Sequence, residues 1–193
     1  MRSTLNRWNR WSIAPLVLAT SGIANAHPGH ADGVLSGLTH PLLGADHLLA
    51  MVAVGLWAWQ LGGRARWQVP ASFVALMSIA AIAGMAGFAL PQVESGIAAS
   101  LLVLGLLIAF SVRTGTVFGA ATVALFALFH GSAHGVEMPL EATAWQYGLG
   151  FVLATVGLHG VGLLLGKGLG RHGWMVRAAG VAIAGSGAWL MVG

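Results

Sequence analysis

Apolar runs of about membrane-spanning length recur along this chain and exclude most other folds. A helix needs about 20 residues to cross the hydrocarbon core of a bilayer. The runs lie at about 41–61, 70–90, 96–112, 116–135, 144–166 and 174–192. The breaks between them are short and carry glycine, proline or charged residues, which are turn signals. We therefore expect an all-α integral membrane protein, a bundle of six transmembrane helices that follows a cleavable signal peptide.

The composition excludes a soluble domain and narrows the possible partners. Only 7% of the 193 residues are charged, whereas a soluble domain carries about 25%. The nine basic residues are spread along the chain, so we expect a lipid bilayer around the protein and no nucleic acid bound to it. Because there is no cysteine, a metal site would use histidine, carboxylate, methionine or backbone oxygen. No Walker A motif occurs, and we expect no organic cofactor.

The first 26 residues have the pattern of a secretory signal peptide. Three arginines precede a short apolar stretch, and Ala24-Asn25-Ala26 forms an A-x-A cleavage site. Cleavage there leaves residues 27–193 as the transmembrane domain. An uncleaved first helix is the alternative, but the apolar stretch is short for a membrane span.

Cleavage after Ala26 would create an N-terminus that begins with a histidine. The α-amine and imidazole of His27 would form a chelating pair, with His30 close by, that captures a metal ion outside the membrane. The other interpretation is a polar tail with no such role, and both remain open.

The distribution of charge predicts the orientation in the membrane. Basic residues fall at the first, third and fifth loops: Arg64, Arg66, Arg113, Lys167 and Arg171. The second and fourth loops carry only the acidic residues Glu94, Glu137 and Glu141. Because Lys and Arg are retained on the cytoplasmic side, we expect a multi-pass protein of the bacterial inner membrane. Its mature N-terminus and its C-terminus would both be periplasmic.

The stretch HPLLGADH, residues 40–47, places an aspartate and two histidines at the start of the first apolar run. Such residues are costly to bury in a membrane and therefore suggest function. Pro41 suits the first turn of a helix, so we expect His40 at the cap with Asp46 and His47 two turns in. On one continuous helix His40 and His47 share a face. Asp46 would either face a neighbouring helix or hold an imidazole in place.

A second polar cluster lies at the end of the fourth run. His130, His134 and Glu137 are spaced i, i+4 and i+7, on one face of a helix that persists through Gly135. The i, i+4 spacing lets two imidazoles share a divalent ion. The predicted topology puts this cluster and HPLLGADH in the outer half of the membrane, so together they predict a divalent-metal site.

His159 lies about 15 residues into the fifth run, nearer the cytoplasmic side. One interpretation is a second, deeper stop for a metal ion. The other is a buried histidine hydrogen-bonded to a neighbouring helix. The sequence leaves both open.

Three segments resemble motifs of the HupE/UreJ family: His40-Pro41-x-x-Gly44-x-Asp46-His47-x-x-x-Met51, residues 129–137 and residues 154–160. The resemblance implies a secondary permease for Ni²⁺ or Co²⁺ that is associated with nickel supply to hydrogenase or urease. It also implies which residues handle the metal: His40, Asp46, His47, His130, His134 and Glu137, with His159 less secure.

Two other functions remain as alternatives. An intramembrane hydrolase would hold Zn²⁺ on the histidines and use Glu137 or Asp46 as general base. The order H-x-x-x-H-x-x-E differs from the H-E-x-x-H of zinc proteases, so we do not expect an enzyme. A sensor that binds metal without transporting it is the second alternative.

Overall fold

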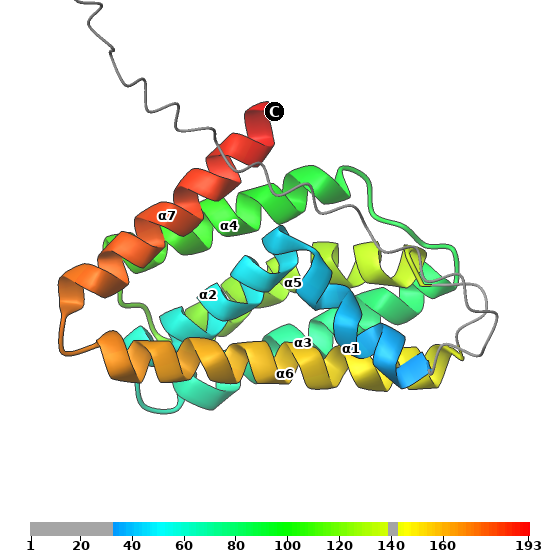
Figure 1. Ribbon diagram of the computed structural model, residues 1–193, viewed down its shortest axis with the longest axis horizontal. Coiled ribbons are helices and arrows are strands. Elements are labelled where there is room, and N and C mark those ends of the chain that lie inside the picture. The colour runs from blue at the N-terminus through cyan, green and yellow to red at the C-terminus, as the bar shows by residue number, and fades with distance from the viewer. Residues whose placement is uncertain (1–32, 139–142) are drawn as a thin grey trace, which may run out of the picture.

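The computed structural model describes residues 33–138 and 143–193, and these residues form helices and turns with no strand. The helices are α1 (Gly33–Leu43), α2 (Ala45–Leu61), α3 (Ala65–Met85), α4 (Val93–Ala109), α5 (Thr116–Val136), α6 (Ala144–Leu169) and α7 (Gly173–Val192). Figure 1 shows α1 and α6 along one side of the bundle and α4 and α7 along the opposite side. The predicted signal peptide, His27, His30 and Glu141 lie outside the described residues.

The helices are those of a membrane protein, although fewer qualify as spans than the sequence predicts. Helices α3, α5, α6 and α7 are each long and apolar enough to cross a membrane. Helices α1 and α2 qualify only together, as a pair bent by 85°, and α4 is a shorter apolar helix. By length and composition the described residues therefore hold four spans, or five with the bent pair. The six-span topology remains a prediction.

The first predicted helix was wrong in its internal structure. Pro41 lies near the end of α1 rather than at the start of a long helix. The helix is interrupted at Gly44, between α1 and α2. Gly44 has an extended backbone (φ −89°, ψ 112°) and forms the N-cap of α2. Asp46 then lies in the first turn of α2, where its charge suits the helix N-terminus. His40 and His47 therefore belong to two different helices and do not share a face.

The third helix also begins earlier than predicted. The predicted run begins at Pro70, whereas α3 starts at Ala65 and holds Pro70 in its second turn. Proline has no amide hydrogen, so residue 70 cannot donate to the Arg66 carbonyl one turn earlier. The helix ends at Met85, and Gly87 follows with a positive φ of 90°, which only glycine adopts without strain.

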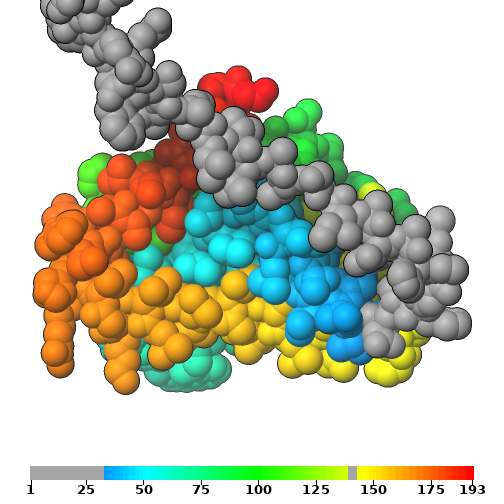
Figure 2. All heavy atoms as spheres, viewed as in Figure 1, coloured from blue at the N-terminus to red at the C-terminus, as the bar shows by residue number. Residues whose placement is uncertain are grey.

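Glycines lie at the contacts between the most closely paired helices. A β-carbon at Gly131 of α5 would overlap the Met77 carbonyl of α3, and one at Gly105 of α4 would overlap the backbone of α7. Helix α6 meets α1 and α2 in the same way, through Gly150 and Gly162. Figure 2 shows α1 lying against α6 on this face of the molecule. Small residues let membrane helices approach closely, and these glycines therefore have a packing role.

The basic loops gather at one end of the bundle. Figure 1 shows the α2–α3, α4–α5 and α6–α7 connections together at that end, with the α3–α4 connection at the opposite one. Arg64 lies in the α2–α3 connection, Arg113 in the α4–α5 connection and Arg171 in the α6–α7 connection. This separation of charge matches the alternation of basic and acidic loops in the sequence, while the orientation in the membrane stays a prediction.

We expect Gly131→Ala to destabilise the protein, because the added methyl group meets the backbone of α3. Overpacking of this kind costs about 1–3 kcal/mol. The measurement is thermal unfolding of the purified protein in detergent. Gly157→Ala on α6 is the matched control, since no atom lies within 4 Å of a β-carbon there. Equal unfolding midpoints for the two variants would contradict the packing role of Gly131.

Candidate metal centre

The bundle brings the two predicted polar clusters together. His134 of α5 lies at the centre, with the ring of His40 4.9 Å away and the ring of His47 4.3 Å away, between centroids. The ring of His130, one turn earlier on α5, lies 5.1 Å from that of His47. The break at Gly44 makes this possible, because it lets the end of α1 and the start of α2 approach α5 from different directions. Four imidazoles therefore form one outer cluster.

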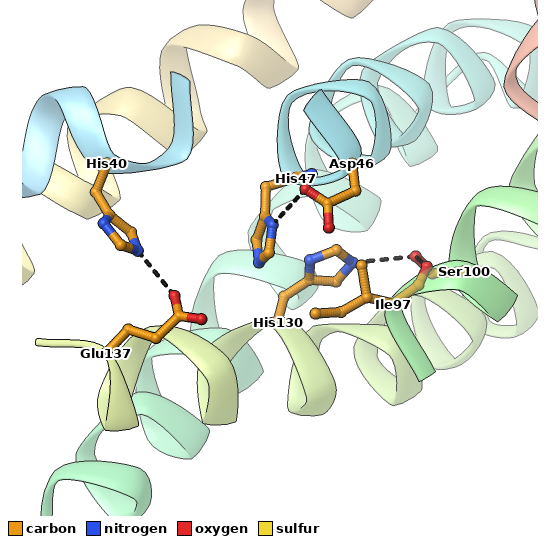
Figure 3. Close-up of polar contacts among 7 residues, drawn as sticks. All are labelled: His40, Asp46, His47, Ile97, Ser100, His130 and Glu137. Atoms are coloured by element: carbon orange, nitrogen blue, oxygen red, sulfur yellow. Dashed lines mark hydrogen bonds and ion pairs between the residues drawn. The ribbon is translucent and has the colours of Figure 1, made fainter. Parts of the chain in front are cut away.

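Three residues at the edge of this cluster have the arrangement of a metal site. One ligand atom from each of His40, His134 and Glu137 lies within 4.8 Å of the others. His40 Nε2 donates a hydrogen bond of 3.0 Å to Glu137 Oε2, which joins α1 to the end of α5 (Figure 3). The Glu137 side chain is 46% exposed and His40 29%, whereas His134 is buried. The trio therefore has an open side at Glu137 and a closed side at His134.

Asp46 holds the imidazole of His47. Its Oδ1 accepts hydrogen bonds from the His47 backbone amide, at 2.8 Å, and from His47 Nδ1, at 2.9 Å. Because an ionised carboxylate only accepts, the proton of a neutral His47 must be on Nδ1. The lone pair is then on Nε2, which is buried and has no hydrogen-bond partner among the described residues. Of the two roles considered for Asp46, the structure shows the positioning of an imidazole.

Ser100 holds the imidazole of His130 in a similar way, and it was not predicted from the sequence. Ser100 of α4 donates its hydroxyl proton to the Ile97 carbonyl at 2.6 Å and lies 3.0 Å from His130 Nε2. The histidine must therefore donate from Nε2 to Ser100, which leaves the lone pair on Nδ1. That atom has no partner among the described residues, and Figure 3 shows it on the side of His47. A lone serine in an apolar run is a weak signal, since serine often bonds only to its own helix.

His134 has no hydrogen bond at either ring nitrogen within the part of the chain that the structure describes, although it is buried. Buried polar groups nearly always have partners, because leaving one unsatisfied costs about 1–3 kcal/mol. A ring with both nitrogens unpaired, beside the imidazoles of His40 and His47, is the feature expected of a residue that binds a ligand.

His159 lies deeper and is separated from the outer cluster by an aromatic ring. Phe73 of α3 is 5.6 Å from the His130 ring and 5.2 Å from the His159 ring, between centroids. Both nitrogens of His159 are buried and unpaired among the described residues. Thr155, one turn away, bonds to the Phe151 carbonyl at 3.0 Å and not to the histidine. Among the described residues His159 therefore has no interhelical hydrogen bond, and its role as a deeper stop for a metal ion stays a prediction.

Tyr147 of α6 is a further neighbour of the site that the sequence reading missed. Its ring is buried 5.8 Å from that of His40, between centroids, and its hydroxyl has no partner among the described residues. The single tyrosine of the chain carries no pattern that would have marked it. Met51, by contrast, packs in the hydrophobic core.

We expect Asp46→Asn to weaken binding of Ni²⁺ to the purified protein, because the substitution replaces the carboxylate that accepts the hydrogen bond from His47 Nδ1 and orients the ring. Loss of such a supporting carboxylate costs about 10–100-fold in metal affinity. Calorimetric titration measures this, and His172→Ala, an exposed histidine before α7, is the control. Unchanged affinity in Asp46→Asn would show that the carboxylate does not support a metal-binding imidazole.

Comparison with known proteins agrees with the motifs at the site. The model of the family described as HupE / UreJ protein matches residues 15–190. The chain is 50% identical to Protein HupE of Rhizobium leguminosarum bv. viciae over 190 residues, which cover 97% of this chain and 100% of that protein. No solved structure matches. On the family match and this near full-length identity, the chain belongs to the HupE/UreJ family.

Proposed function

We propose that this protein is a secondary permease that takes up Ni²⁺ or Co²⁺ across the bacterial inner membrane and supplies metal for hydrogenase or urease maturation. The observation that carries the proposal is the outer cluster, in which four buried or half-buried imidazoles and Glu137 converge from three helices. The link of the HupE/UreJ family to nickel supply for these enzymes supports the same function.

The donor set favours a borderline divalent ion. Imidazole nitrogen suits Ni²⁺, Co²⁺ and Zn²⁺, whereas Mg²⁺ and Ca²⁺ prefer sites made of oxygen alone. A chain without cysteine offers no thiolate to favour Cu(I). Both Asp46 and Glu137 lie at the cluster, and two carboxylates offset the charge of one divalent cation. This balance matters because an isolated charge is costly to bury inside a membrane.

The unpaired nitrogens define a route from the open side of the cluster inward. An ion would meet Glu137 and His40 first, because Glu137 is exposed and His40 is half-buried, whereas His134 is buried. It would pass to His134, His47 and His130, and then past Phe73 to His159. The His47 ring lies 4.3 Å from the His134 ring and 5.1 Å from the His130 ring, between centroids. Several sites of moderate affinity suit transport better than one tight site, since the ion must also leave.

The charge distribution supports inward transport. The cluster lies near the end of α5, at the end of the bundle opposite the basic loops. Under the positive-inside rule the basic end faces the cytoplasm and the cluster faces the periplasm. Both termini of the mature chain are periplasmic in this arrangement.

We expect His134→Ala to reduce nickel accumulation in intact cells to the level of cells without the protein, because it removes the central ligand of the cluster. His172→Ala is the control and should accumulate nickel like the wild type, with both variants present in the membrane at equal levels. Wild-type accumulation in His134→Ala would exclude the proposed route. A sensor that binds nickel without moving it would instead give no accumulation even in the wild type.

A further inference from the structure

A cavity of about 370 Å³ lies at the basic end of the bundle, outside the proposed metal route. It is formed where α2, α4 and α6 end and α7 begins, and its polar lining includes Gln60, Arg66, Ser111 and Arg113. Figure 1 shows this end opposite the end of α5, the helix that carries His130 and His134. The cavity therefore needs a ligand chemistry of its own.

The electrostatic character of this cavity is positive. Arg66 and Arg113 are its charged lining residues, and no carboxylate contributes to the lining that the structure describes. The carboxylates of the described residues lie elsewhere, at the starts of α2 and α4 and the end of α5: Asp46, Glu94 and Glu137. Arg64 and Arg171 in the neighbouring loops add to the positive field. A cavity with this charge attracts an anion.

Other polar side chains near the cavity already have structural roles. Gln60 Nε2 donates to the Ile108 carbonyl at 3.1 Å, and Arg177 Nε donates to the Ala109 carbonyl at 2.9 Å. Both bonds engage carbonyls in the last turn of α4, and the Ile108 carbonyl also accepts from the Ser111 amide at 3.0 Å. Arg66 and Arg113, by contrast, have no hydrogen bond or ion pair to any described residue.

The guanidinium of Arg66 is held in place by an aromatic ring. It lies 3.9 Å from the centroid of the Trp59 ring, a cation–π contact. Stacking on an aromatic face fixes the plane of the guanidinium and leaves its edge N–H groups able to bind oxygen atoms. Two N–H groups on one edge of a guanidinium have the spacing to bind two oxygen atoms of a phosphate, and arginine binds phosphate in this paired way. The positive-inside rule explains why basic residues are numerous at this end of the bundle. It does not explain why two of them line a cavity.

We infer that this cavity binds the phosphate of a phosphorylated ligand, with Arg66 and Arg113 as its anchors. The level of the cavity along the bundle favours a phospholipid headgroup. Trp67 and Trp174 lie at the same end, and their exposed fractions are 59% and 70%. Exposed tryptophans of this kind mark the level of lipid headgroups. Basic pockets between membrane helices on the cytoplasmic side bind anionic lipids in the same manner. Free phosphate has the same chemistry and is the second source to be tested.

The experiment measures thermal unfolding of the full chain, purified in a neutral detergent at constant ionic strength. The probes are short-chain phosphatidylglycerol, inorganic phosphate, and a diacylglycerol of the same chain length without phosphate. A ligand of the folded state raises the midpoint with the logarithm of its concentration. We expect a rise with phosphatidylglycerol if the source is lipid, or with inorganic phosphate if it is free, and none with diacylglycerol. No rise with either phosphate probe would overturn the inference.

Substitutions then assign the binding to the two arginines. Arg66→Gln and Arg113→Gln should each weaken the apparent affinity about tenfold, as expected for a lost charge-assisted hydrogen bond. Arg64→Gln is the matched control, because Arg64 is the N-cap of α3, two residues before Arg66, and does not line the cavity. Equal effects in all three variants would indicate a diffuse charge effect and contradict a defined site. Each arginine is tested alone, so that one variant that fails to fold leaves the other to decide.

Discussion

The outer cluster depends on the sharp turn at Gly44. The 85° bend between α1 and α2 takes His40 away from the helix that carries His47 and places it beside Glu137. Glycine at this position also leaves room for the Asp46 and His47 side chains. A β-carbon at residue 44 would lie 2.9 Å from Asp46 Oδ1 and 3.2 Å from His47 Nδ1. A side chain at this position would therefore disturb the hydrogen bond that sets the tautomer of His47.

Helix α5 combines packing and chemistry in adjacent residues. Gly131 and Gly135 directly follow His130 and His134, and successive residues on a helix point about 100° apart. The glycines let the backbone of α3 approach closely, while the histidines face the cluster formed with α1 and α2. The same close approach places Phe73 of α3 between His130 and His159. Helix packing and the order of groups along the proposed route are therefore set together.

The features predicted well from the sequence are local ones. The i, i+4, i+7 cluster of His130, His134 and Glu137 needs only an uninterrupted helix, and α5 provides it up to Val136. The predicted arrangement of HPLLGADH is wrong because Pro41 does not start a helix. Gly44 and the acidic first turn after it mark the start of the helix that carries His47. The contact between His40 and Glu137 joins residues 97 positions apart. Like the roles of Ser100 and Tyr147, it follows from tertiary packing that no local pattern encodes.

The central claim is that the outer cluster admits a metal ion that then crosses the membrane. Purified protein in sealed vesicles that contain a nickel-sensitive dye tests it most directly, with Ni²⁺ added outside and a pH gradient present or absent. The account predicts that the internal signal rises with the wild type and stays at the level of empty vesicles with His134→Ala. Wild-type protein that binds external Ni²⁺ without any internal signal, with or without the gradient, would contradict it.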